Sequence, residues 1–379
     1  MGKGGKYLAQ KPVAAKKKKK ILPIILTVLV IIVALCVGAG VLYYNYLLNM
    51  ISRPDTLVER PTEVIIAETA AATEAVEETE AATSPEDTWP VVVSDENITN
   101  FMLVGNAYRP GEEYYITDTM ILVSVNRETK TVTLTSLMRD MCLVWPKYTD
   151  TLGKTHSGNN RINMAYNMGY SWTQNKQDSM DVLESIVQHN FGIPVERTIE
   201  VDFDLVNKIA EMLGGVWVEL SQEEIDYLVE NYPASNTAKT LEPGWCHLSP
   251  YLTLCYARMR KVGHGDYERT ERQRTVITNM LRQLTQMNIL EINRLFQEIL
   301  PMITTDMTNQ EITNYALEFI PMLKDLKIQS QRIPFDGNEK SVTRETDGVV
   351  DYMIAPADLK KTAQQLQESI GMTVAEAAN

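Results

Sequence analysis

Six basic side chains lie within the nineteen residues from Tyr256 to Arg274. They are Arg258, Arg260, Lys261, Arg269, Arg272 and Arg274. Guanidinium groups present planar, permanently charged donor forks that match phosphate oxygens two at a time, so an arginine cluster suits phosphate binding. A solvated helix with internal ion pairs is an equal alternative, because Asp266, Glu268 and Glu271 reduce the net charge of this segment to +3. The spacing alone leaves both interpretations open.

Helix signals indicate how these residues are positioned. Ser249 is a typical N-cap and Pro250 suits the first helical position, so a helix is predicted to begin there and run into the arginines. Further along, Arg269, Arg272 and Gln273 recur at spacings of three and four residues. That spacing places them on one face of a helix.

Strand and helix patterns interleave through the rest of the chain. Asn100–Asn106 and Met120–Asn126 are short apolar runs typical of central strands covered on both faces. Residues 131–138 alternate, and the polar stretch 127–130 indicates a hairpin. The other predicted elements are helices over 178–189, 205–213 and 357–370, strands over 198–203, 216–220 and 328–334, and two amphipathic helical stretches after 288. This order predicts an α/β fold, a layered α-β-α domain with a mixed central sheet.

The first 44 residues indicate a membrane anchor. Eight lysines lie in residues 1–20, and an uncharged run from 21 to 44 follows them. About 20 apolar residues cross the hydrocarbon layer, and lysine-rich flanks stay in the cytoplasm. We therefore expect a cytoplasmic basic tail, one N-terminal transmembrane helix and an extracytoplasmic globular domain at the cell membrane.

An acidic segment follows the predicted span. Residues 45–98 are poor in aromatic residues and rich in Ala, Thr and Glu, which predicts a disordered tether. The whole chain carries a formal net charge of -13. Nucleic-acid-binding domains usually have a broad basic face, so an arginine cluster on an acidic, extracytoplasmic domain argues against nucleic acid as partner.

The cysteines and histidines give no chemical signature of their own. The chain has four cysteines and four histidines, without metal-ligand spacing and without a spacing that suggests a nucleophilic dyad. Three cysteines follow the predicted span, an odd number that implies no disulfide framework. Cys246 and Cys255 form the one conceivable pair, but Cys255 falls within a predicted helix and is expected to pack as a small apolar residue.

Five motifs occur in an order that resembles the LytR-CpsA-Psr family of cell-wall enzymes. They are NFMLVGNAYR, ITDTMILVSVNRETKTVTLTSLMRD, RINMAY, FGIPVERTIEVDFDLVNKIAEMLGGVWVEL and HLSPYLTLCYARMRKVGHGDYERTERQR. The resemblance covers a catalytic domain at residues 99–288 and leaves 289–379 as a C-terminal α/β extension. It implies a bacterial, Gram-positive protein that transfers a glycopolymer, of the teichoic acid or capsular polysaccharide type, from a polyprenyl pyrophosphate carrier to peptidoglycan as a phosphodiester. The implied partners are this lipid-linked glycan, peptidoglycan and the cytoplasmic membrane, and the implied cofactor is Mg²⁺.

The resemblance also assigns roles to residues. Asp118 would bind the metal and help to deprotonate the attacking hydroxyl, while Arg139, Arg258 and Arg260 would form the catalytic clamp on the phosphates. The residues implied to bind the pyrophosphate of the lipid carrier are Arg109, Arg139, Arg258, Arg260, Arg269, Arg272 and Gln273. Without the resemblance, Asp118 would be interpreted as a turn residue and Arg139 as a structural partner of Asp140. Fixed positive charge of this kind stabilises the leaving phosphate.

Two positions depart from the family pattern. Ala107 stands where the family commonly has an aspartate, and Ile116 stands where it commonly has an arginine. An alanine cannot ligate a cation, so any Mg²⁺ depends on Asp118, substrate phosphates, water, or a neighbour such as Glu112 or Glu113. Two hypotheses follow: an active phosphotransferase, and a degenerate member that binds the lipid-linked glycan or a cell-wall partner without turnover.

Overall fold

The computed structural model describes residues 40–54, 94–106, 117–233, 235, 237–346 and 349–372. The predicted basic tail, most of the predicted span and most of the acidic segment lie outside these residues. Within the described part of the chain, no helix is both long and apolar enough to cross a membrane. The chain divides into two compact units, residues 1–46 and 47–379, and the architecture described below belongs to the second.

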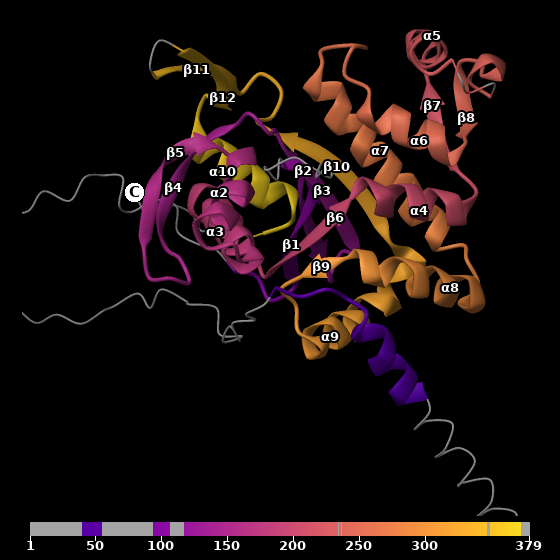
Figure 1. Ribbon diagram of the computed structural model, residues 1–379, viewed down its shortest axis with the longest axis horizontal. Helices are drawn as coiled ribbons and strands as arrows, with labels where there is room; N and C mark the ends of the chain where they lie inside the picture. The colour runs from indigo at the N-terminus through magenta and orange to yellow at the C-terminus, as the bar shows by residue number, and fades with distance from the viewer. Residues whose placement is uncertain are drawn as a thin grey trace, which may run out of the picture. The chain divides into compact units, whose positions relative to one another are not determined.

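A mixed six-stranded sheet in the order β10-β3-β2-β1-β6-β9 forms the centre of this unit (Figure 1). The strands are β1 (Ile98–Asn106), β2 (Thr117–Asn126), β3 (Thr131–Leu137), β6 (Arg197–Asp202), β9 (Thr304–Thr305) and β10 (Lys327–Ile333). β2 pairs antiparallel with both β1 and β3, whereas β6 runs parallel to β1 and β10 runs parallel to β3. The predicted mixed α/β fold is thereby confirmed.

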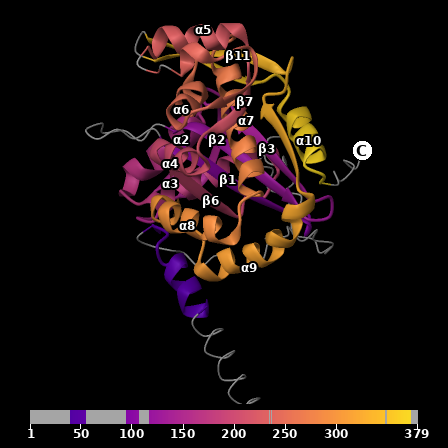
Figure 2. The same ribbon diagram turned by 90° about the vertical axis from the view of Figure 1, so that its right-hand side faces the viewer.

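Helices cover both faces of this sheet, because the side chains of each strand alternate between two cores. Met102, Val104, Met120 and Leu122 belong to one core, whereas Phe101 and its neighbours belong to another. One layer contains α2 (Asn163–Thr173), α3 (Lys176–Phe191) and α10 (Leu359–Ser369), and the other contains α4 (Phe203–Leu213), α7 (Asp266–Leu284), α8 (Ile289–Ile299) and α9 (Asn309–Phe319). Figure 1 shows the two layers on opposite sides of the sheet, and in Figure 2, turned by 90°, the layer with α4, α7 and α8 faces the viewer.

Three two-stranded ribbons lie outside the central sheet. They pair β4 (Cys142–Thr149) with β5 (Thr155–Arg161), β7 (Val216–Leu220) with β8 (Gly244–Leu248), and β11 (Glu339–Thr346) with β12 (Val349–Pro356). The β7-β8 ribbon packs with α5 (Gln222–Asn231), α6 (Pro250–Arg258) and α7 into a separate apolar core. Cys142, Cys246 and Cys255 are free thiols, so the conceivable Cys246–Cys255 disulfide is absent among the described cysteines.

Local sequence signals explain the helix boundaries near the sheet edge. The Ser249 side chain accepts a hydrogen bond from the Leu252 N–H with Pro250 at the first position of α6, as predicted. The Asp202 side chain accepts from the Leu205 N–H and caps α4 directly after β6. Gly214 ends α4 with a φ of 74°, which a glycine adopts without the steric cost of a side chain. These caps place two helix ends next to the strands that they follow or precede.

Two segments have a closer relation to the sheet than the sequence predicted. Residues 289–379, expected as an α/β extension, supply β9 and β10 and therefore complete the central sheet. Residues 47–54, expected as the start of the tether, belong to the folded unit, because Ser52 bridges to Thr304 and Arg53 donates to the Met307 carbonyl. Arg53 also donates to the Ile51 carbonyl and to Asn309 Oδ1, each at 2.7 Å.

Candidate functional site

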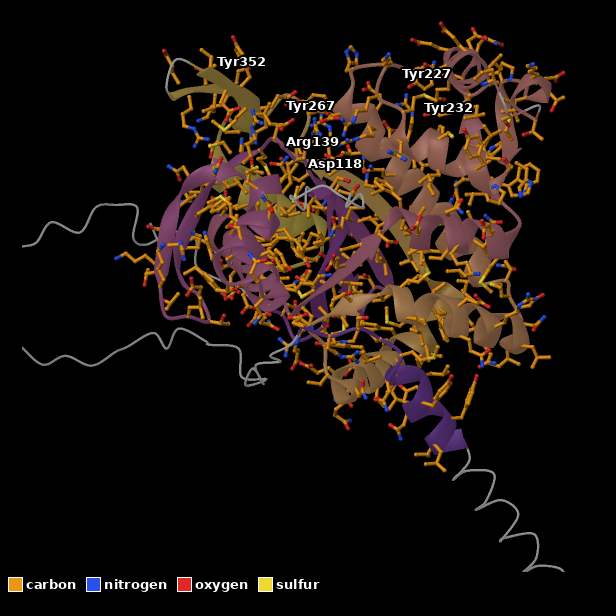
Figure 3. All side chains as sticks on the ribbon, viewed as in Figure 1. Asp118, Arg139, Tyr227, Tyr232, Tyr267 and Tyr352 are labelled. Carbon is orange, nitrogen blue, oxygen red and sulfur yellow. The ribbon has the colours of Figure 1, made fainter. Side chains whose placement is uncertain are left out.

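The ends of four strands meet at one edge of the central sheet. β1 and β6 run parallel and finish together, with Asn106 opposite Asp202, and β2 begins beside them, with Thr117 opposite Asn106. Asp118 is the second residue of β2, and Arg139 comes two residues after β3. Ligand sites in α/β sheets form at such edges, where loops diverge from the strand ends. Figure 3 shows Asp118 and Arg139 close together at the upper end of the view.

The connection from α6 to α7 brings the arginine cluster to the same edge. α6 ends at Arg258, Arg260 lies in the connection, and α7 begins at Asp266. Gly265 precedes α7 with a φ of 78°, in the left-handed region that favours glycine. A side chain at this position would strain the turn that places Asp266 beside Arg139.

Asp118 is the acceptor at the centre of the cluster. Its Oδ1 accepts from Arg139 Nη1 at 2.7 Å and its Oδ2 accepts from Arg260 Nη2 at 2.9 Å. Arg269 donates from Nη2 to the Asp118 carbonyl at 3.2 Å and lies 3.7 Å from Oδ2. One aspartate therefore orients three guanidiniums, which come from a strand end, a loop and a helix.

Asp266 makes a second set of contacts with the same three arginines. Its carboxylate lies 2.6 Å from Arg139 Nε, 3.4 Å from Arg269 Nε and 3.5 Å from Arg260 Nε. From the sequence, Asp266 was expected only to reduce the net charge of the arginine segment. Its position in the first turn of α7, three residues before Arg269, is the signal that could have identified it.

A cavity of about 430 Å³ opens onto this network. We call it the arginine cavity; its lining residues are Asp118, Phe203, Tyr232, Arg258, Arg260, Arg269 and Gln273. The Arg258 guanidinium lies 4.7 Å above the centre of the Phe203 ring, and Arg258 has no carboxylate partner within the described part of the chain. Burial raises the pKa of Tyr232 to about 12, so its hydroxyl stays protonated at neutral pH and is able to donate a hydrogen bond.

Positive charge predominates around the arginine cavity. Four guanidiniums, those of residues 139, 258, 260 and 269, face two carboxylates, those of residues 118 and 266. Burial lowers the pKa of Arg139, but hydrogen bonding to Asp118 and the charges of Asp266, Asp140 and Asp118 outweigh it, so the net shift is upward. The cavity therefore keeps a fixed excess of positive charge, which suits a phosphate-bearing ligand.

Most of the predicted site residues that the structure describes lie around the arginine cavity. Arg272 is the exception. Arg272 is buried on another side of α7, where its Nε donates to Glu224 at 2.7 Å and its two Nη groups donate to the Met259 and Val262 carbonyls. It holds the α6–α7 connection in place instead of lining the cavity. The helical spacing did not predict this position correctly. Arg269 and Gln273 are four residues apart and share one face of α7, whereas Arg272 lies at the border of that face. Ala107, Arg109, Glu112, Glu113 and Ile116 lie outside the described residues.

Tyr232 and Phe203 are site residues that the sequence analysis missed. Phe203 follows β6 directly, and the end of a parallel strand is a signal that could have identified it. Tyr232 follows α5, far from the arginines in sequence, and no motif or periodicity marks it. Only the packing of α5 against α6 brings it to the cavity.

An apolar groove adjoins the arginine cavity. It lies between the sheet and the helices α4, α6 and α7, and Phe203 and Gln273 line both spaces. The residues that line only the groove include Leu103, Val201, Val206, Leu254, Ala257 and Val276. Its volume is about 60 Å³, so it is narrow, and its exposed surface is almost wholly apolar. A cationic cavity and an apolar groove therefore share one wall.

Two places among the described residues offer carboxylates to a metal ion. Asp118 is one, and each of its oxygens accepts one hydrogen bond from a guanidinium and keeps a further lone pair, so it fits as one ligand of a Mg²⁺ completed by phosphate oxygens and water. The other is a group of Asp181, Glu184 and Asp306 in the core. Glu184 and Asp306 both accept hydrogen bonds from Thr198, which gives this group a structural role at the start of β6.

Comparisons with known sequences point to one family. The sequence model of the LytR_cpsA_psr family matches residues 64–368. Biofilm regulatory protein A of Streptococcus mutans is 25% identical over 296 residues, which are 76% of this chain and 68% of that protein. TagU of Bacillus anthracis, named a polyisoprenyl-teichoic acid to peptidoglycan teichoic acid transferase, is 23% identical over 283 residues, 74% of this chain and 82% of TagU. TagV of Bacillus subtilis, which has the same description, is 26% identical over 183 residues, 48% of this chain and 42% of TagV.

Solved structures share the fold. The protein gbs0355 of Streptococcus agalactiae superposes with a TM-score of 0.56 at 21% identity, over 75% of this chain and 91% of that one. A structure described as TagT bound to LI-WTA superposes with a TM-score of 0.53 at 19% identity, over 73% of this chain and 92% of TagT.

Proposed function

The chain belongs to the LytR-CpsA-Psr family, and from this premise we propose that it transfers a glycopolymer from a polyprenyl pyrophosphate carrier to peptidoglycan. One observation carries the proposal: the arginine cavity and the apolar groove share Phe203 and Gln273. A polyprenyl pyrophosphate has a dense negative charge joined directly to a hydrocarbon chain. The cationic cavity suits the charged part of such a lipid, and the narrow apolar groove, of about 60 Å³, suits the start of its hydrocarbon chain.

We assign the arginines to the pyrophosphate. Asp118 and Asp266 fix the guanidiniums of Arg139, Arg260 and Arg269 before the ligand arrives, so little ordering remains to be done on binding. Arg258 has no carboxylate partner among the described residues and therefore contributes uncompensated charge. The Tyr232 hydroxyl and the Gln273 amide add neutral donors.

The proposed reaction exchanges one P–O bond for another. A hydroxyl oxygen of the acceptor glycan attacks the phosphorus that carries the glycopolymer, and the bond from that phosphorus to the bridging oxygen breaks. The polyprenyl phosphate departs with the electron pair, and the arginines stabilise its new negative charge. The hydroxyl proton passes to a base, a role for which the resemblance points to Asp118. The product is a phosphodiester between the glycopolymer and peptidoglycan.

We further propose that Asp118 ligates Mg²⁺ together with phosphate oxygens and water. Such an ion would neutralise charge on the phosphates and polarise the phosphorus under attack. The TagU and TagV relatives carry teichoic acid in their names, which makes an anionic polymer of this type the first donor to test. The expected setting is the outer face of the cytoplasmic membrane, with the run 21–44 as anchor.

A degenerate binding protein is the second candidate, and Ala107 favours it. An aspartate at this position would offer a second carboxylate for the ion, and alanine offers none. Such a protein would retain the lipid-linked glycan through its arginines without transferring it. Only turnover separates the two candidates.

The deciding experiment incubates the purified full chain in detergent with a polyprenyl-pyrophosphate oligosaccharide and peptidoglycan fragments across a Mg²⁺ titration. The proteins compared are the natural chain, Ala107→Asp and Asp118→Ala. An active transferase gives Mg²⁺-dependent product in the natural chain, more product at limiting Mg²⁺ in Ala107→Asp, and none in Asp118→Ala. Tight lipid binding without product at any Mg²⁺ concentration would instead establish the binding protein, and product from Asp118→Ala would refute the metal assignment.

A further inference from the structure

A second large cavity lies on the other side of α7. Its volume is about 650 Å³, and it lies between α7 and β10 with the loop that follows β10. We call it the β10 cavity; the lining residues used below are Tyr267, Glu268, Arg274, Arg332 and Phe335. The proposed chemistry at the arginine cavity makes no use of these side chains.

Arg274 is the unusual residue of the β10 cavity. It is 6% exposed, and both its Nε and its Nη1 are buried without a hydrogen-bond acceptor, whereas every other arginine in the described part of the chain has at most one such nitrogen. Burial lowers the pKa of Arg274 to about 10, so the group remains charged at neutral pH. A buried charge without a bonded partner is costly, and an anionic group of a ligand would remove that cost.

Glu268, in the same cavity, has a hydrogen-bond acceptor without a donor. Its Oε2 is buried and accepts no hydrogen bond from any described residue. A ligand hydroxyl or amide would satisfy this oxygen. The β10 cavity therefore contains both an unsatisfied donor group and an unsatisfied acceptor.

Arg332 does not compete for the same ligand group. It donates to the Pro334 carbonyl at 2.6 Å, pairs with Asp336, and lies 4.2 Å above the Tyr267 ring. Its charge is thus already balanced, and its guanidinium packs on Tyr267, which together with Phe335 forms an aromatic wall of the cavity.

The charge of the lining argues against a phosphate-rich ligand. The carboxylates of residues 268, 271, 336 and 339 outnumber the guanidiniums of residues 274 and 332. A multiply charged anion would meet net repulsion, whereas a ligand with one carboxylate and many hydroxyls would match Arg274 and the surrounding acceptors. Aromatic and carboxylate side chains together suit a saccharide.

The β10 cavity is also well placed relative to the arginine cavity. Asp266 and Arg269 face the arginine network, while Tyr267 and Arg274 line the β10 cavity. Consecutive helix residues point about 100° apart, so the two spaces flank the same helix. Asp266 pairs with Arg139, and the next residue, Tyr267, lines the β10 cavity.

We infer that the β10 cavity is the acceptor subsite, which binds a saccharide carrying a carboxylate, with the carboxylate on Arg274 and a sugar hydroxyl or amide on Glu268. The inference rests on the proposed function for the presence of a glycan acceptor. The chemistry fits an N-acetylmuramic acid unit, whose lactyl ether links a sugar to a carboxylate or to a peptide that ends in one.

Direct binding tests the inference without turnover. The full chain in detergent is titrated calorimetrically with a soluble disaccharide containing N-acetylmuramic acid with a free carboxylate, with the neutral N,N′-diacetylchitobiose, and with inorganic phosphate. We expect the carboxylated disaccharide to bind at least about tenfold more tightly than N,N′-diacetylchitobiose, and Arg274→Gln to abolish this difference. Arg274→Lys is expected to restore part of it, and Arg294→Gln, on the exposed side of α8, is expected to leave it unchanged.

The outcomes separate this inference from the proposed function. Saccharide binding that depends on Arg274, without any transfer, would support the acceptor subsite and contradict the transferase function. Transfer by the natural chain, together with unchanged acceptor affinity in folded Arg274→Gln, would contradict the subsite alone. Phosphate binding that is lost in Arg274→Gln and is tighter than binding of the carboxylated disaccharide would also overturn the inference, because phosphate held at the arginine cavity does not depend on Arg274. If Arg274→Gln does not fold, Glu268→Gln decides: it must weaken both saccharides and leave polyprenyl phosphate affinity unchanged.

Discussion

At the scale of single residues, the site depends on two aspartates that organise arginines. Asp118 and Asp266 each contact Arg139, Arg260 and Arg269, so every one of these guanidiniums is held from two directions. A guanidinium fixed in this way can present its remaining N–H groups to a ligand at low entropic cost. The aspartates and arginines therefore act as one unit, and their substitutions should not be additive.

Arg260 provides the direct test of phosphate binding. It is the most exposed of the three shared arginines, so Arg260→Ala should leave the fold intact and weaken polyprenyl phosphate binding by about 1.5 to 3 kcal/mol, the range for hydrogen bonds to charged groups. Calorimetric titration measures the change. Lys261→Ala, at the adjacent exposed position, is the matched control. Equal affinities in the two variants would contradict phosphate binding and favour the alternative that the arginines only form ion pairs on a solvated helix.

Asp266→Asn tests the organising role separately. Three guanidiniums would lose one counter-charge, so we expect the variant to unfold about 1 to 3 kcal/mol more easily than the natural chain. Inorganic pyrophosphate supplies the missing negative charge, and we expect it to raise the melting temperature of Asp266→Asn more than that of the natural chain. Differential scanning fluorimetry gives both numbers, and an equal pyrophosphate effect in the two proteins would refute the role.

The sequence predicted which residues belong to the site better than it predicted the directions of their side chains. The structure places Asp118, Arg139, Arg258, Arg260, Arg269 and Gln273 together, and their roles in binding stay a prediction. The resemblance misplaced Arg272, because the direction of a helical side chain depends on where the helix begins and how it is rotated against its neighbours. Tyr232 could not be predicted, since a loop residue reaches the cavity only through the packing of α5 against α6.

At the scale of secondary structure, the predictions held where local signals are strong. The strand predicted at 216–220 coincides with β7, and the helix predicted at 205–213 lies within α4, which begins two residues earlier at the Asp202 cap. The ribbon of β4 and β5 was missed, because its second strand is polar throughout and has no buried face to produce an alternating pattern. A strand in a ribbon outside the main sheet therefore shows little alternation of apolar and polar residues from which it could be predicted.

The junction between β1 and β6 supports a prediction about pH. Glu196 precedes β6 and its Oε2 accepts from the Asn100 N–H at 3.0 Å. Burial raises the pKa of Glu196 from 4.5 to about 7. The folded state therefore favours the protonated acid, and the associated stability is fully present below about pH 4.5 and is lost as the pH rises through about 7.

Glu196→Gln should remove this dependence while retaining an acceptor for the Asn100 N–H. We expect the variant to be more stable than the natural chain at about pH 8 by about 1 to 2 kcal/mol, with a smaller or opposite difference at about pH 5. Urea unfolding at both pH values measures the difference. Glu230→Gln, at an exposed position of α5, should show no such pH-dependent difference, and parallel pH profiles for Glu196→Gln and the natural chain would contradict the assignment.

At the scale of the whole molecule, α7 organises the folded unit. One side of this helix carries Asp266 and Arg269 toward the arginine cavity, and another carries Tyr267 and Arg274 toward the β10 cavity. A donor and an acceptor bound on two sides of one helix would meet near its first turn, next to Arg139. This arrangement depends on β10, so residues 289–379 contribute to the acceptor side and not only to the sheet.

The contacts of Arg53 have a topological consequence for the intact chain. Residues 47–54 and residues from 94 onward belong to the same folded unit, so the residues on both sides of the acidic segment are held in that unit. A cut within that segment breaks one covalent connection but leaves Arg53 bonded to Met307 and Asn309. Insertion of a site-specific protease sequence between Ala72 and Thr73, followed by cleavage, should give two fragments that still migrate together in size-exclusion chromatography. Arg53→Ala should promote their separation, whereas Arg294→Ala should not. If the predicted span is the anchor, a proteolytic nick in the acidic segment would not by itself release the folded unit from the cell surface.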